Sequence, residues 1–297
     1  MRTITAGINS FDLIVPTKNR PTDIACLFRS ITCQTLLPNK IIIIDQSNDQ
    51  SCKDIIFETM RAVTEQVVLD YVHSPEVTGL VLAKKIGLTR TNSDLIFFLD
   101  DDIELDENYF NEIVTAFQKN QQIIGCAGFI ENAKSNYFWK FAFNVFHTGV
   151  FADKRPNIYT TPPINGVYVP SNKLPQGVSA WRRFVFNDVI FQPELGFHVV
   201  EDLWFSIMVE NFYPSSQFIL TTARAKHFHA PVGRLQKPRS FERKLGEFTA
   251  LWKTIRSRKN DISFCWLMVG FAAEALFLSI KTRDIVFVRS FFRHLAN

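Results

Sequence analysis

The sequence predicts an α/β fold with a mainly parallel sheet flanked by helices. Three observations support this prediction. Short apolar segments alternate with amphipathic segments through the first 130 residues. One apolar segment contains four consecutive isoleucines, Ile41 to Ile44, which is typical of a strand covered on both faces. Polar clusters directly follow several apolar segments, as they do at the carboxyl ends of the strands in such a sheet.

The expected elements follow one another in a regular order. The segment after the first strand has apolar residues at helical spacing, with Pro21 suited to a first helical turn. Ser51 and Asp54 have the spacing of a capping box that opens the next helix. Strands are expected over residues 11–16, 41–44, 67–72, 94–99 and 123–130, and helices over 21–36, from 51, over 79–91, after 106 and over 203–210.

The composition is that of a globular protein. The chain has 297 residues, 46% of them hydrophobic, which is enough to bury the core of one large or two small domains. Its five cysteines are odd in number and widely spaced, so we expect reduced thiols in a cytosolic setting. The N-terminus lacks an apolar segment of signal-peptide length, so export is not expected. We predict an α/β domain over residues 1–237 and a basic, then apolar, helical region over 238–297.

Three polar clusters follow predicted strands, at Pro16 to Arg20, at Asp45 to Asp49 and at Asp100 to Asp102. In a parallel sheet all three would share one rim. Carboxylates at such a rim can hold Mg²⁺ or Mn²⁺, which bind through one or two carboxylates together with substrate phosphates. The alternative is that one aspartate caps the next helix and the others are solvated.

With these residues in view, the chain resembles the family 2 glycosyltransferases of GT-A fold. Six segments match in the family's order over roughly 225 residues. They are IVPTKNR, IIIIDQSND, FFLDDD, GVSAWRR, the pair Glu201-Asp202 and HFHAPVGR. The ordered set is more specific than any single segment, because D-x-D is common by chance.

The resemblance implies a nucleoside diphosphate sugar as donor and a bound Mn²⁺ or Mg²⁺ ion. Asp45 would contact the base, and Asp100 with Asp102 would hold the ribose side and the metal. From the residues alone, Asp45 is better explained as an Asx turn after a strand. The residues implied for the nucleotide-sugar site are Pro16, Thr17, Asn19, Arg20, Asp45, Lys84, Asp100, Asp101, Gly177 and Arg234.

Two histidines are candidates to complete the metal site. His227 and His229 are two residues apart, so on a strand they would point to the same side. His227 fits the family spacing better. The sequence departs from the family at Ala83-Lys84-Lys85, where many members have Arg followed by Asn. A lysine can still bind phosphate as a point charge.

The pair Glu201-Asp202 resembles the family's catalytic acidic pair, with Asp202 as general base. A positioned carboxylate accelerates such a step by a factor of about 10² to 10⁴. The expected outcome is inversion without a covalent sugar intermediate. The alternative explanation is that both residues stabilise a helix N-terminus, which is worth about 0.3 to 1 kcal/mol.

The last sixty residues contain a basic flank and then an apolar stretch. The stretch from Ile262 to Ile280 is nearly long enough to span a bilayer, but Glu274 lies inside it. We therefore expect helices that pack on the catalytic domain or lie on a membrane surface. A plain amphipathic cap on the core is the alternative. No nucleic-acid-binding motif accompanies the basic run, so a nucleic-acid partner is not expected.

These features predict a metal-dependent inverting glycosyltransferase at the cytoplasmic face of the cell membrane. The acceptor would be a saccharide, possibly carried on lipid, in surface polysaccharide biosynthesis. Two alternatives come from other classes: a sugar-phosphate nucleotidyltransferase, and a catalytically silent sugar-nucleotide-binding subunit. The acidic pair disfavours both.

Overall fold

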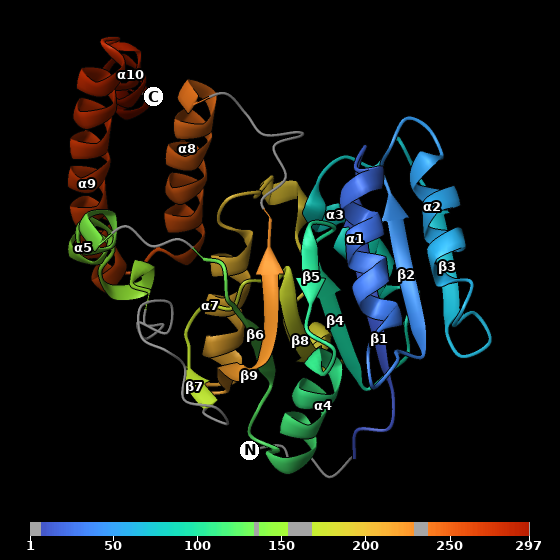
Figure 1. The fold of residues 1–297 in the computed structure, drawn as a ribbon. Coiled ribbons are helices and arrows are strands. Elements are labelled where there is room, and N and C mark those ends of the chain that lie inside the picture. The colour runs from blue at the N-terminus through green and yellow to red at the C-terminus, as the bar shows by residue number, and fades with distance from the viewer. Residues whose placement is uncertain (1–6, 134–136, 154–167, 229–236, 297) are drawn as a thin grey trace.

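The computed structural model describes residues 7–133, 137–153, 168–228 and 237–296. Within these residues, one mixed sheet of nine strands forms the centre of the molecule, in the order β3-β2-β1-β4-β8-β6-β9-β5, with β7 paired to β9 (Figure 1). Helices cover both faces of the sheet. The predicted α/β fold is therefore confirmed.

The N-terminal half alternates strand and helix as the sequence predicts. All of its strand pairings between β1 and β4 are parallel, and they place the carboxyl ends of these strands on one edge. The elements are β1 (Phe11–Thr17), α1 (Pro21–Thr32), β2 (Lys40–Asp45), α2 (Ser51–Met60), β3 (Val68–His73), α3 (Leu80–Leu88), β4 (Leu95–Leu99), β5 (Ile103–Leu105) and α4 (Tyr109–Lys119).

The second half of the sheet is less regular. β8 lies between β4 and β6 and is antiparallel to both, so the sheet is mixed and its parallel part is the β3-β2-β1-β4 region together with the β6-β9 pair. The elements are β6 (Gly125–Ile130), α5 (Tyr137–Phe146), η1 (Gly149–Phe151), β7 (Tyr168–Pro170), β8 (Val178–Arg182), α6 (Val185–Asp188), η2 (Pro193–Leu195), α7 (Glu201–Phe212) and β9 (Gln217–His227).

The four isoleucines of β2 show how the core is built. Ile41 and Ile43 pack into the cluster on the face covered by α1, α2 and α4, while Ile42 and Ile44 pack into the cluster on the other face. All four side chains are fully buried. The prediction of a strand covered on both faces is confirmed.

The predicted capping box at Ser51 and Asp54 is wrong. Helix α2 begins at Ser51 itself, and its N-cap residue Gln50 makes no side-chain cap hydrogen bond. The hydroxyl and backbone N–H of Ser51 instead donate to Asp49 Oδ1, at 2.6 and 3.0 Å. Asp49, and not Asp54, is therefore the carboxylate that accepts the backbone N–H of Ser51.

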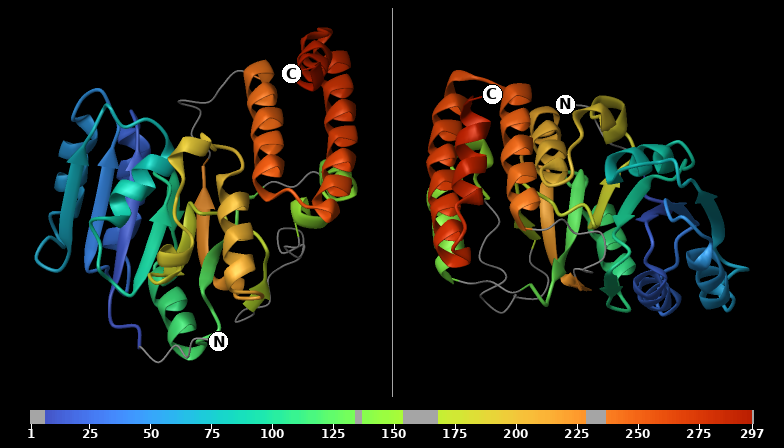
Figure 2. Two further views of the ribbon diagram at one scale, coloured as in Figure 1. Left: turned by 180° about the vertical axis from the view of Figure 1, so that it is seen from behind. Right: turned by 90° about the horizontal axis from the view of Figure 1, so that it is seen from above.

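Three C-terminal helices stand beside the sheet: α8 (Lys237–Ile255), α9 (Arg258–Thr282) and α10 (Val286–Ala296) (Figure 2). Apolar residues of all three join the same buried cluster as residues of α7 and the sheet. The boundary predicted at residue 237 therefore separates two segments that share a core. Among the residues that the structure describes, one helix, over residues 259–282, is long and apolar enough to cross a membrane by length and composition alone, with a mean hydropathy of 1.8 and 33% of its apolar window buried.

Candidate active site

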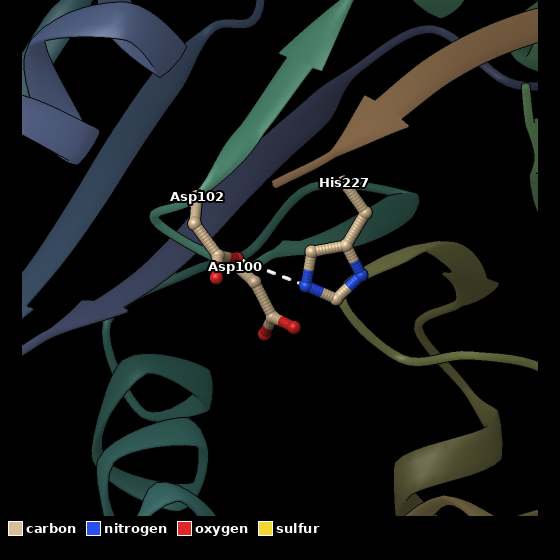
Figure 3. Close-up of side chains that lie close together, drawn as sticks. All are labelled: Asp100, Asp102 and His227. Carbon is tan, nitrogen blue, oxygen red and sulfur yellow. Dashed lines mark ion pairs between the residues drawn. The ribbon is translucent and has the colours of Figure 1, made fainter. Parts of the chain in front are cut away.

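Three side chains that are far apart in the sequence converge at the rim of the sheet. Asp100, Asp102 and His227 each offer one ligand atom, and these atoms all lie within 4.8 Å of one another. His227 Nε2 lies 3.0 Å from Asp102 Oδ1 (Figure 3). The structure thus brings together the two aspartates and the histidine that the sequence assigns to a metal.

Strand pairing explains why His227 reaches the aspartates. The antiparallel pair β5-β9 sets Ile103 opposite His227, so Asp102 is one residue from the histidine's partner. The backbone N–H of Phe228 donates to the Asp102 carbonyl at 3.0 Å. Asn132 then holds the His227 backbone on both sides, accepting from its N–H at 2.9 Å and donating to its carbonyl at 3.1 Å.

Gly177 is in close contact with Asp100. Its carbonyl accepts the Asp100 backbone N–H at 3.0 Å. A Cβ atom at position 177 would lie 2.1 Å from Asp100 Oδ2. A larger residue at position 177 would therefore require the Asp100 carboxylate to move.

An open cleft of about 620 Å³ lies over these residues. It contains the predicted residues Pro16, Thr17, Asn19 and Arg20 from the end of β1, and the three aspartates that follow β4. His227 also lines the cleft. The remaining residues at its wall were not singled out from the sequence as donor-site residues; they are Lys18, Gln46, Gly79, Leu80 and His198.

Asp101 makes its contacts with the end of β1 and does not belong to the group of candidate metal ligands. Its Oδ2 accepts from the Thr17 hydroxyl at 2.8 Å and its Oδ1 accepts from Arg20 Nη1 at 2.8 Å. Burial raises the pKa of the Asp101 carboxyl to about 6, although Arg20 and Thr17 oppose the shift. The middle aspartate of the triplet therefore ties the end of β1 to the end of β4.

Asp45 lies beneath the cleft and is fully buried. Its Oδ1 accepts the backbone N–H of Ser47 at 2.8 Å, and its Oδ2 accepts from the Tyr71 hydroxyl. Ser47 Oγ in turn accepts the backbone N–H of Asn19 at 2.7 Å. Asp45 thus forms the Asx turn that the residues alone favoured, and its predicted contact with a base stays a prediction.

The acidic pair begins helix α7, where Lys84 from α3 meets it. Lys84 Nζ donates to Glu201 Oε1 at 2.7 Å and to Gln176 Oε1 at 2.9 Å, and its side chain is only 1% exposed. Glu201 is thereby fixed by an ion pair. Asp202 accepts no side-chain hydrogen bond from the described residues, which leaves its carboxylate available.

The charges of the acidic pair interact with those of Lys84 and Asp100. Burial lowers the pKa of Lys84, but the carboxylates of Glu201, Asp202 and Asp100 outweigh it, so the net shift is upward. Burial raises the pKa of Asp100, opposed by Lys84 and His227 and reinforced by Asp102 and Asp202. One buried ammonium therefore balances several carboxylates, an arrangement typical of functional sites.

The donor set fits a divalent cation. Two carboxylates and one imidazole suit Mn²⁺, and carboxylates with phosphate oxygens suit Mg²⁺. Neighbouring ligands of an octahedral ion at about 2.1 Å lie about 3 Å apart. His227 Nε2 and Asp102 Oδ1 are 3.0 Å apart and form an ion pair when the imidazole is protonated, a separation that also allows both to bind one ion.

Two predicted site residues, His229 and Arg234, lie outside the described residues. Between the two candidate histidines, only His227 can thus be placed. His198 was missed because it stands in a segment without a motif. The signal that could have found it is its position just before the acidic pair.

Comparison with known proteins gives a family match and a set of similar folds. The model of the family described as "Glycosyl transferase family 2" matches residues 12–188, more than half of the chain. A 4,4'-diaponeurosporenoate glycosyltransferase of Staphylococcus haemolyticus is 28% identical over 116 residues, which is 39% of this chain and 30% of the relative's length.

Several solved structures share the fold at low sequence identity. S. aureus TarS 1-349 superposes with a TM-score of 0.57 at 16% identity, covering 89% of this chain and 72% of TarS. GalNAc-T7 with UDP, GalNAc and Mn²⁺ has a TM-score of 0.61 at 14% identity, covering 83% and 48%. Mycobacterium tuberculosis glucosyl-3-phosphoglycerate synthase with Mg²⁺ and UDP has a TM-score of 0.53 at 14% identity, covering 82% and 78%.

Proposed function

The chain belongs to glycosyl transferase family 2, and we propose that it is an inverting, metal-dependent glycosyltransferase. In this proposal it moves a sugar from a nucleoside diphosphate sugar to a saccharide acceptor. The observation that supports it most is the convergence of Asp100, Asp102 and His227 at a cleft, with Asp202 within electrostatic reach of Asp100.

The donor would lie in the cleft, with its diphosphate toward the three metal-binding side chains. Two of the similar structures hold UDP together with Mn²⁺ or Mg²⁺, which supports a nucleotide donor and either of these cations. Asp100, Asp102 and His227 would hold the cation. When bound, such a cation neutralises charge that gathers on a departing diphosphate. The residues from Pro16 to Arg20, together with Asp101, would line the nucleotide side of the cleft. Lys84 would act on the donor indirectly, through its ion pair with Glu201. Gly177 would act indirectly as well, through its close contact with Asp100.

Asp202 would act as the general base. It takes the proton of the acceptor hydroxyl as that oxygen bonds to the anomeric carbon and the nucleoside diphosphate leaves from the opposite side. One displacement of this kind inverts the anomeric configuration. Glu201 is already paired with Lys84, so it would keep the start of α7 in place rather than accept the proton.

The C-terminal helices support a peripheral membrane contact. Apolar side chains of α9 are exposed along one stripe at near-helical spacing, at Ile262, Trp266, Val269, Leu276 and Ile280. Lys281 and Arg283 lie at the end of this stripe and are exposed. We infer that the stripe lies on anionic lipid at the cytoplasmic face of the membrane, where a lipid-linked acceptor for surface polysaccharide assembly would be within reach.

The donor is tested by screening nucleoside diphosphate sugars with Mn²⁺ for a thermal shift, followed by product analysis. We expect one donor to raise the melting temperature, the shift to disappear on chelation, and a nucleoside diphosphate to be released. Release of pyrophosphate from a nucleoside triphosphate and a sugar phosphate would contradict the proposal.

The membrane contact is tested by co-sedimentation with vesicles. The protein is expected to sediment with anionic vesicles and, to a smaller extent, with neutral ones, and Ile262→Glu with Ile280→Glu is expected to abolish sedimentation. The control is Val68→Glu, which changes an exposed apolar residue of β3. Leu267 of α9 is buried, so its replacement is not a suitable control. Protein that stays in the supernatant with both vesicle types would refute the membrane contact.

A further inference from the structure

A carboxylate of the C-terminal helices holds the segment that leads into the acidic pair. Glu247 of α8 accepts three consecutive backbone N–H groups on its Oε2, from His198 at 2.8 Å, Val199 at 2.5 Å and Val200 at 3.2 Å. Successive N–H groups that converge on one anion form a backbone nest. These contacts join two segments almost fifty residues apart.

The start of α7 has no side-chain cap of its own. Val200 is the N-cap residue of α7 and has no polar side chain, so helix α7 begins without a side-chain cap. The next two residues are Glu201 and Asp202. The acidic pair is thus held from two sides, by the Lys84–Glu201 ion pair and by the carboxylate of Glu247 just before it.

The same segment also reaches the cleft. His198 lies at the cleft wall, and a Cβ atom at Gly79 would lie 3.3 Å from its Cε1. Because Glu247 binds the backbone N–H of His198, it constrains both the residue at the donor cleft and the acidic pair three residues later. A displacement of about 1 Å at such a point can reduce a rate by about 10²-fold.

The contacts of Glu247 explain why a charged side chain stands at this buried position. Glu247 is only 8% exposed, and its Oε1 has no hydrogen-bond partner among the described residues. Burying a carboxylate is unfavourable unless it is hydrogen-bonded, and the three N–H groups that meet Oε2 supply that compensation. The charge is suited to three N–H donors at a helix N-terminus, where the dipole also favours it.

We propose that Glu247 is a positioning residue, which holds residues 198–200 from the C-terminal helices and thereby sets the place of Asp202. Helix α8 packs against α10 and α9. Turnover then depends on the C-terminal helices, although none of their described residues lines the cleft. The kinetic part of this inference rests on the proposed function.

The test compares Glu247→Ala and Glu247→Gln with Glu242→Ala in the full chain. Glu242 lies on the same helix and accepts from the Ser290 hydroxyl at 2.5 Å, so its loss removes a contact of α8 without touching the segment. Three quantities are measured: hydrogen–deuterium exchange of the amides at 198–200, affinity for UDP with Mn²⁺, and kcat for donor turnover.

For Glu247→Ala we expect amide exchange at 198–200 to rise about tenfold or more and kcat to fall about 10- to 100-fold, with UDP affinity within twofold of wild type. Glu247→Gln keeps an oxygen acceptor and should lie between this variant and wild type. Glu242→Ala should change neither exchange at 198–200 nor kcat.

Exchange at 198–200 that stays at the wild-type rate in Glu247→Ala would overturn the inference, as would faster exchange with unchanged kcat. If Glu247→Ala does not fold, Glu247→Gln against Glu242→Gln decides by the same readouts. Wild-type protein without turnover would overturn the proposed function, while the exchange measurement would still decide whether Glu247 holds the segment.

Discussion

The rim of the sheet and the C-terminal helices each contain a lysine–glutamate ion pair, and the two pairs lie in different surroundings. Lys84 and Glu201 at the rim are 2.7 Å apart, with side chains 1% and 6% exposed. Lys244 and Glu274 join α8 to α9 at 2.9 Å, with side chains 31% and 30% exposed. The distances are similar, so burial is the main difference.

The difference in burial separates an ion pair within the candidate active site from an ion pair at the protein surface. Buried charges are expensive unless they are paired, so a cluster of them at a strand end indicates a chemical use. The half-exposed pair of the helices is an ordinary surface contact. It does, however, explain how Glu274 is accommodated in the apolar middle of α9.

The largest effect is expected at the rim. Asp202→Asn should lower kcat by about 10² to 10⁴, because the amide cannot take the acceptor proton. Stability should change little, since Asp202 accepts no side-chain hydrogen bond from the described residues. Nucleoside diphosphate release measures the effect, and Asp54→Asn, also in the first turn of a helix, is the matched control. Turnover within threefold of wild type would remove Asp202 from the reaction.

The two ion pairs can be compared directly. Lys84→Met should lower the free energy of unfolding by about 3 to 5 kcal/mol, because it leaves buried carboxylates without a counter-charge. Lys244→Met should lower it by about 0 to 1 kcal/mol. Urea denaturation followed by circular dichroism measures both. Equal losses in the two variants would show that burial does not separate the pairs.

A smaller effect is expected at Gly177, which lies directly against the Asp100 carboxylate. Gly177→Ala places a methyl group against Asp100 Oδ2, so Asp100 must move. We expect Mn²⁺ affinity to fall about 10- to 100-fold, the range seen when the supports of a metal ligand are lost. Gly246→Ala on α8 is the control, because a Cβ there meets no atom within 4 Å. Unchanged Mn²⁺ affinity in Gly177→Ala would show that Asp100 is not a ligand.

Much of the N-terminal half could be predicted from local pattern. The isoleucine run of β2, the strand ending at Leu99 and the polar clusters at strand ends all depend on residues near one another in sequence. The metal role of Asp100 and Asp102 was also suggested by their place at a strand end, whereas the choice of His227 as their partner came from the family resemblance. The structure adds the cause of their convergence, the pairing of β5 with β9.

Other features could not be predicted, because they depend on tertiary contacts. The pairing of Lys84 with Glu201 joins residues 117 positions apart, and no spacing rule indicates it. Asp101 turns away from the other two aspartates because Thr17 and Arg20 hold it. The contact of Glu247 is made to backbone N–H groups, which no side-chain pattern reveals.

The smallest predicted effect lies in the helical region and concerns pH. His147 follows α5, stacks on Phe143 with ring centroids 3.6 Å apart, and has its pKa lowered to about 4, chiefly by burial. As the pH falls, His147 therefore becomes protonated near pH 6.5 in the unfolded chain but only near pH 4 in the folded chain. The free energy of unfolding is therefore unaffected by this group above about pH 6.5 and decreases as the pH falls from there toward 4.

Lowering the pH from 7 to 5 should thus reduce the free energy of unfolding by about 1 to 2 kcal/mol through His147. In His147→Gln this part of the pH dependence should disappear. Urea denaturation at the two pH values measures it. A variant with the same pH dependence as wild type would assign the titration to other groups.

The convergence of Asp100, Asp102 and His227 on one cation is tested most directly by calorimetric titration with UDP. Wild-type protein should bind UDP in the presence of Mn²⁺ and lose at least about tenfold in affinity when the metal is chelated, whereas Asp102→Asn should bind it weakly under both conditions. Equal affinity of the wild type with and without Mn²⁺, or full metal dependence in Asp102→Asn, would contradict a metal site at this rim.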